Sequence, residues 1–146
     1  MEPAFSRVEF GIVSRSRPQR ADAGSAVAAA AYNLCGRLAD GGRQFDFRRK
    51  AGEHAAHNVL LPAGAPPEMR DPGNLWRAAE AAERRADAQT ARQVLVSIPR
   101  ELPTADRLAF AEAIAAPWVA DGAAVQIDIH NPRAADGASS RTRISL

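Results

Sequence analysis

The chain has little cysteine, little lysine and no long apolar run, and the first and last of these scarcities each exclude a class of protein. The single cysteine, Cys35, cannot form an internal disulfide, so a reducing cytoplasm is the expected compartment. No apolar run approaches the roughly 18 residues that a membrane span needs, so no membrane partner is expected. Lys50 is the only lysine among 19 basic residues. The arginines suit bidentate phosphate contacts, although a GC-rich genome produces the same bias.

The rest of the composition is that of one soluble globular domain spanning residues 1–146. Hydrophobic residues make up 46% of the chain and charged residues 25%, which is ordinary for a domain with a buried core. The net charge of +2 is too small to indicate a nucleic-acid partner by itself.

Hydrophobic patterning and turn signals predict alternating strands and helices. Strands are expected at residues 8–13, 45–47, 58–61, 94–98 and 123–130, and from residue 141. Helices are expected at residues 25–38, from Pro72 after an Asp71 cap, and from Thr104. This order predicts an α/β (α+β) two-layer sandwich with a mainly antiparallel sheet and helices packed on it.

The last two predicted strands each alternate between apolar and polar residues. If they pair as a hairpin, His130, Arg141 and Arg143 share one polar face. That face is cationic and suits phosphate, and a guanidinium cannot lose its proton to become a metal ligand. The alternative is that Asp128 pairs with one arginine and the face is simply solvated.

Several segments, in the same order, resemble the MobA/MobL family of conjugative relaxases. They are Ser25-Ala-Val-Ala-Ala-Ala-Ala-Tyr32 with Gly36-Arg37-Leu38, Phe45-Asp46-Phe47-Arg48-Arg49-Lys50, Leu60-Leu61-Pro62, Asp87-Ala88-Gln89-Thr90, Ile98-Pro99-Arg100 and Ile129-His130-Asn131-Pro132.

The resemblance implies a relaxase (HUH-endonuclease-like) fold and a DNA-nicking activity at a plasmid transfer origin. Tyr32 stands at the position of the nucleophile that attacks the scissile phosphate of single-stranded DNA. Three histidines would hold a divalent cation, Mn²⁺ or Mg²⁺, that offsets charge in the transition state. His130 corresponds to the first of them. The expected nucleic-acid contacts come from the basic residues Arg48, Arg49, Lys50, Arg141 and Arg143.

The chain departs from the family pattern at the other two histidines, which follow an Asp-Gly pair as His-x-His. With one extra residue after Asp136-Gly137, Arg141 and Arg143 fall on these positions, and without it Ser140 and Thr142 do. Neither alignment restores a metal site, so His130 is the single remaining ligand position and no cofactor is expected unless the protein is active. His54 and His57 are expected in a surface loop.

Two further departures agree with this loss. An acidic-x-acidic pattern of the family is replaced by Gln93-Val94-Leu95, which is neutral at both positions. The family's nuclease domain also continues past the His-x-His strand, where this sequence stops, so a shortened form is expected.

Three functions are therefore open. The first is a relaxase-derived nucleic-acid-binding protein of a mobile element with impaired catalysis, or a repurposed inhibitor of a protein partner such as a host defence complex. The second is an active single-strand nickase, either metal-dependent or assisted by Arg141 and Arg143. The third is a decayed gene fragment.

Overall fold

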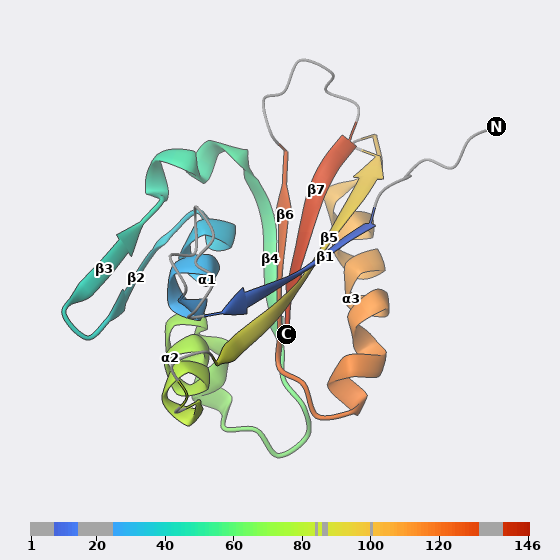
Figure 1. Cartoon of the computed structure of the whole chain (residues 1–146). Coiled ribbons are helices and arrows are strands. Elements are labelled where there is room, and N and C mark those ends of the chain that lie inside the picture. The colour runs from blue at the N-terminus through green and yellow to red at the C-terminus, as the bar shows by residue number, and fades with distance from the viewer. Residues whose placement is uncertain (1–7, 15–24, 84, 86–87, 100, 132–138) are drawn as a thin grey trace.

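The computed structural model describes residues 8–14, 25–83, 85, 88–99, 101–131 and 139–146, without the side chains of residues 99 and 139–141. Five strands form an antiparallel sheet in the order β1-β5-β7-β6-β4, and two more form a hairpin (Figure 1). The sheet strands are β1 (Val8–Ser14), β4 (His54–Leu60), β5 (Gln89–Pro99), β6 (Val125–His130) and β7 (Ser139–Ser145). The hairpin consists of β2 (Arg37–Asp40) and β3 (Arg43–Asp46).

In the described part of the chain, three α-helices flank the sheet and two short 3-10 helices connect the elements. They are α1 (Ala26–Leu34), α2 (Pro72–Ala82), α3 (Thr104–Ala120), η1 (Arg48–Glu53) and η2 (Pro67–Arg70). As the sequence predicts, the Asp71 side chain caps α2 by accepting a hydrogen bond from the Asn74 N–H at 3.1 Å. No helix in the described part of the chain is both long and apolar enough to cross a membrane.

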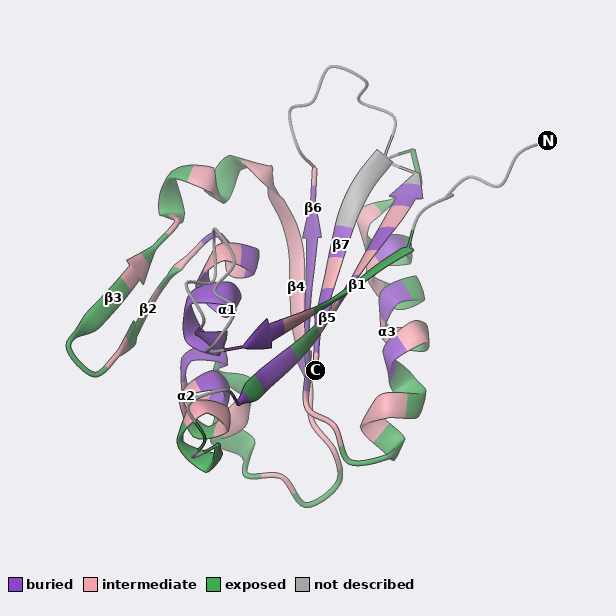
Figure 2. Ribbon diagram, viewed as in Figure 1, coloured by how far each residue is buried: buried purple, intermediate pink, exposed green. Residues whose placement is uncertain are grey.

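The predicted α+β class with a mainly antiparallel sheet is confirmed, but the helices do not lie in one layer. Helices α1 and α2 cover one face of the sheet and α3 covers the other (Figure 1). The physical reason is β6, whose six residues are all buried, so both of its faces need cover (Figure 2). The arrangement is therefore three-layered rather than a two-layer sandwich.

The first helix is shorter than predicted, ending at Leu34 instead of continuing to about residue 38. Cys35 adopts the left-handed conformation with a φ of 53°, and its N–H bonds back to the carbonyls of Ala31 and Tyr32. The chain then continues into β2. The turn at Gly41-Gly42 reverses its direction, so that β3 pairs with β2 as a hairpin. Alanine content alone could not place this boundary.

Helix α1 lies close to the sheet because its contact surface is made of small side chains. Ala28 and Ala31 are fully buried, and Ala26 and Ala30 nearly so. At the start of the helix the Ala26 N–H donates to Glu80 on α2, with 2.6 Å between the nitrogen and Oε1. This packing fixes the position of the last turn, which carries Tyr32.

Candidate functional site

Tyr32 lies at the end of α1, over the sheet, and two cations lie against its ring. Lys50 Nζ, on η1, donates a hydrogen bond to the Tyr32 hydroxyl at 2.9 Å and sits 4.0 Å from the ring centroid. The Arg143 guanidinium carbon, on β7, is 5.3 Å from the same centroid. Phe47 packs edge-on against a further side of the ring, with 5.3 Å between the two ring centroids. Two of the predicted phosphate-binding residues therefore converge on the predicted nucleophile.

The last two strands pair as the alternation predicts. His130 stands opposite Arg141 and Asp128 opposite Arg143 in the antiparallel register of β6 and β7. Directly opposed residues share one face of a sheet, so these four positions lie on the same side. The Arg141 side chain lies outside the described part of the structure, as does the Asp136-Gly137 segment.

The polar face of β6 is buried rather than solvated, contrary to the alternative considered from sequence. Gln126 and Asp128 have no exposed surface, and His130 is 6% exposed. The Trp76 indole on α2 donates to Gln126 Oε1 at 2.7 Å, and Gln126 Nε2 donates to the carbonyl of Ala30 at 3.3 Å. Helices α1 and α2 thus cover this row of polar residues and satisfy part of it.

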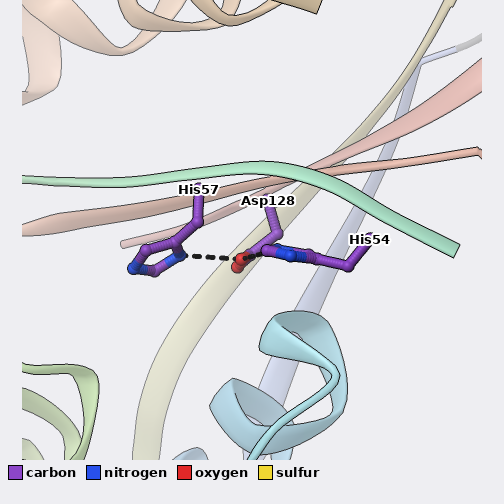
Figure 3. A group of neighbouring side chains, drawn as sticks. All are labelled: His54, His57 and Asp128. Atoms are coloured by element: carbon purple, nitrogen blue, oxygen red, sulfur yellow. Dashed lines mark hydrogen bonds and ion pairs between the residues drawn. The ribbon is translucent and has the colours of Figure 1, made fainter. Parts of the chain in front are cut away.

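Asp128 accepts hydrogen bonds from two histidines of β4. His54 Nε2 lies 2.9 Å and His57 Nδ1 lies 2.8 Å from the same carboxylate oxygen, Oδ1 (Figure 3). The other oxygen, Oδ2, accepts from Gln126 Nε2 at 2.7 Å. Burial by itself would raise the pKa of this carboxyl, but the hydrogen bonds from His54 and His57 outweigh it, and the pKa lies below its ordinary value. Asp128 is therefore ionised at neutral pH.

The prediction that His54 and His57 lie in a surface loop is wrong. Strand β4 begins at His54 rather than at residue 58, and both side chains are half-buried. Residues three apart in a regular strand face opposite sides, but the register with β6 shifts between His54 and Ala56. This bulge turns both imidazoles towards Asp128. The sequence shows no signal for such a bulge, so the cluster could not be predicted.

His130, the predicted ligand position, lies beside this cluster but makes different contacts. Its ring is 5.6 Å from that of His54, and its Nδ1 is 3.8 Å from the Cys35 sulfur. Its Nε2 is buried and has no hydrogen-bond partner within the described residues. Burial, with smaller contributions from Arg143 and His54, lowers the pKa of His130 to about 4. The imidazole is therefore neutral at pH 7.

The rest of the predicted basic segment lies on the exposed side of η1. Arg48 is bound by Asp46, with 2.9 Å from Nε to Oδ1 and 2.7 Å from Nη2 to Oδ2. These hydrogen bonds hold the pKa of the Asp46 carboxyl at about 2. Arg49 is exposed. Of the three basic residues, only Lys50 contacts Tyr32 through an identified hydrogen bond within the described structure.

The sequence matches the MobA/MobL family over residues 24–139, which is most of the chain. The chain belongs to the MobA/MobL family. It is 33% identical over 108 residues to a conjugal transfer protein TraA of Agrobacterium fabrum and 34% identical over 122 residues to a probable mobilization protein MobA of Bifidobacterium longum. A mobilization protein MobL of Acidithiobacillus ferridurans is 34% identical over 114 residues. These matches cover 66%, 82% and 75% of this chain.

The chain is much shorter than these relatives, spanning 10%, 21% and 29% of their respective lengths. A solved structure that concerns the molecular basis of vancomycin resistance transfer in Staphylococcus aureus has the same fold, with a TM-score of 0.81. The similarity covers 97% of this chain and 69% of that one, at 22% sequence identity. The expected relaxase-like fold is confirmed, and the chain is a relaxase-like protein of the kind found on mobile elements.

The metal that the family implies does not fit the ligand positions inferred for it in this chain. Of the three positions, only His130 keeps an imidazole, and an arginine at position 143 offers no lone pair to a cation. The donor atoms that do converge in the described structure are those of His54, His57 and Asp128, which lie within 4.8 Å of one another. They come from β4 and β6 rather than from β6 and β7.

Proposed function

We propose that this MobA/MobL protein is a relaxase-derived nucleic-acid-binding protein of a mobile element in which DNA-nicking chemistry is impaired. The observation that carries the proposal is the position of Arg143, whose guanidinium lies 5.3 Å from the Tyr32 ring centroid on the inferred ligand strand. The guanidinium of an arginine attracts a phosphate by its charge. Unlike a metal ion, it cannot accept lone pairs from the phosphate oxygens or from protein ligands. The site thus favours holding DNA over cleaving it.

The contacts of Tyr32 support a role in binding single-stranded DNA. Lys50 and Arg143 place two positive charges beside Tyr32, and clustered cations of this kind attract a phosphate backbone. In this proposal Tyr32 is the ancestral nucleophile, His130 a former ligand, and Arg141, Arg48 and Arg49 extend the phosphate contacts. A cytoplasmic location is part of the proposal, supported by the unpaired and buried Cys35.

The test combines binding with trapping of a covalent intermediate. Labelled single-stranded oligonucleotides from transfer origins of related plasmids are incubated with the wild type and Tyr32→Phe in Mn²⁺, in Mg²⁺ and in EDTA. We expect salt-sensitive binding by both proteins, with little or no protein–DNA adduct under any condition. An abundant adduct that disappears in Tyr32→Phe would refute impaired catalysis. Absence of binding would refute the nucleic-acid role and direct the search to a protein partner such as a host defence complex.

A second candidate is an arginine-assisted nickase, and the same contacts favour it. Arginine and lysine side chains stabilise charge on a phosphoryl group in other phosphoryl-transfer sites without being metal ligands. In this case the adduct forms in EDTA as well as in Mn²⁺, and Arg143→Gln reduces it strongly. The binding protein and the nickase are therefore separated by one gel.

A further inference from the structure

We propose that His54, His57 and Asp128 form a divalent transition-metal site, displaced from the ligand positions inferred from the family resemblance. The site joins β4 to β6 on the face of the sheet that is covered by α1, the helix that carries Tyr32. Metal binding by these three residues is independent of whether the protein binds or cleaves DNA.

The spacing of the three donor atoms suits a metal ion. Both imidazole nitrogens lie within 2.9 Å of Asp128 Oδ1, and all three atoms lie within 4.8 Å of one another. A point equidistant from atoms so placed is no more than about 2.6 Å from each, and zinc–ligand distances of about 2.0–2.2 Å require shifts of about half an ångström. Small side-chain rotations supply such shifts.

The carboxylate is held in the orientation that a ligand needs. Gln126 donates to Asp128 Oδ2 at 2.7 Å, which leaves Oδ1 for the histidines. Gln126 is itself fixed by Trp76 and by the carbonyl of Ala30. Hydrogen bonds of this kind behind a metal ligand fix its orientation and raise the affinity of the site. Asp128 is therefore oriented by a chain of hydrogen bonds, as the ligands of metal sites are, rather than being part of an isolated ion pair.

The two histidines provide access for the cation. The side chain of His54 is 19% exposed and that of His57 is 26% exposed, whereas that of Asp128 is fully buried. They approach the carboxylate from opposite sides (Figure 3). An ion can thus enter between two partly exposed imidazoles and neutralise a buried negative charge.

The donor set selects the class of metal. Two imidazoles and one carboxylate suit zinc and neighbouring transition metals such as cobalt and nickel, whereas Mg²⁺ and Ca²⁺ prefer sites made of oxygen atoms. Three protein ligands leave at least one coordination position for water or for an oxygen of a bound phosphate.

The site is tested with the tag-free, EDTA-dialysed chain of residues 1–146 and no DNA. We expect isothermal titration to show one Zn²⁺ bound per chain, and Co²⁺ to give the visible absorption bands of a low-symmetry site. His54→Gln and His57→Gln should each weaken Zn²⁺ binding by at least about tenfold, because each removes a ligand. His130→Gln, which changes the third and last histidine of the chain, is the matched control and should alter affinity by less than about threefold.

Two results would overturn the proposal. One is the absence of stoichiometric Zn²⁺ uptake by the wild type. The other is loss of binding in His130→Gln with retention in His57→Gln, which would put the cation at the histidine position implied by the family resemblance. Circular dichroism checks that each variant is folded, and His57→Gln carries the test if Asp128→Asn does not fold, because His57 is the most exposed of the three ligands.

Discussion

Lys50 donates a hydrogen bond from Nζ to the hydroxyl of Tyr32, with 2.9 Å between the two atoms, and so the only lysine of the chain is joined to its only tyrosine. The two residues are 18 positions apart, and the hairpin β2-β3 lies between them. The pair is formed because α1 stops at Leu34 and the chain returns through β3 to η1 beside the end of the helix (Figure 1). A phosphate approaching Tyr32 therefore also meets Lys50.

Replacing Lys50 by glutamine should weaken the binding of single-stranded DNA several-fold at low salt, because one phosphate contact is lost. The slope of log affinity against log salt concentration should fall by about one. Fluorescence anisotropy between about 50 and 200 mM salt measures both quantities. Arg70→Gln removes the same charge from an exposed position on η2 and should leave the slope unchanged. Equal effects of the two changes would mean that Lys50 acts only through net charge.

The structure brings only some of the predicted site residues together, and the reasons differ from residue to residue. Tyr32 and Arg143 were predicted and lie together, because strand alternation and the pairing of the last two strands follow from the apolar pattern. His54 and His57 lie in a strand and not in the expected loop, and the sequence does not show this because a bulge that redirects a side chain leaves no trace in hydrophobic periodicity. Asp128 was considered only as a partner for arginine. Its actual partners, His54 and His57, lie on β4. The order of the strands in the chain does not show that β4 pairs with β6.

Changing Arg141 and Arg143 together to histidine should restore metal-dependent chemistry if they replace the family's ligands. We expect a covalent protein–DNA adduct that exceeds the wild-type level in Mn²⁺, is absent in EDTA and is abolished by adding Tyr32→Phe. Imidazoles at these positions would supply lone pairs beside His130, which guanidinium groups cannot. Denaturing gel electrophoresis of a labelled transfer-origin oligonucleotide measures the adduct.

The control is the double change of the same two arginines to glutamine, which removes both charges without adding ligands. That variant should lose DNA affinity and gain no adduct. If it gained as much adduct as the histidine pair, the arginines would be inhibitory by charge alone, and the assignment of positions 141 and 143 to metal ligands would be wrong.

Cys35 should react slowly with thiol reagents in the folded protein, because burial raises the pKa of its thiol above 9.0, with a smaller opposing effect of Lys50. Only the thiolate is nucleophilic, so the rate should rise with pH and remain below that of the unfolded chain throughout pH 7.5 to 9. The same pKa shift makes the stability of the folded state depend on pH. A raised pKa in the folded state stabilises it below pH 9.0, and this contribution is lost as the pH rises through the folded value.

Reaction with Ellman's reagent, with and without urea, measures the difference at the only thiol of the chain. Equal rates in the two conditions would mean that Cys35 is accessible in the native state. Its 4% exposure and its contact with His130 argue against that result.

The fold was more predictable than the site, because it follows from longer patterns. Long helical periodicity identifies α2 and α3, whereas the apolar run at residues 94–98 identifies only the second half of β5. The layer count differs for a local reason: the sequence does not show that the polar residues of β6 are buried, whereas in the structure Trp76 and the alanines of α1 cover them. Polar residues satisfied by hydrogen bonds within the protein look the same in sequence as polar residues satisfied by water.

Ala30→Leu tests whether the closeness of α1 to the sheet is what positions Tyr32. Ala30 is 1% exposed, and its carbonyl accepts a hydrogen bond from Gln126 Nε2, so a larger side chain has no room without moving the helix. Overpacking of this kind should lower the free energy of unfolding by about 1–3 kcal/mol, measured by urea denaturation. Ala81→Leu, at an exposed position of α2, should change it by less than about 0.5 kcal/mol. Because Gln126 also orients Asp128, a displaced helix should weaken Zn²⁺ binding in Ala30→Leu as well. If stability and Zn²⁺ affinity were both unchanged, α1 would tolerate a wider separation from the sheet than its alanines indicate.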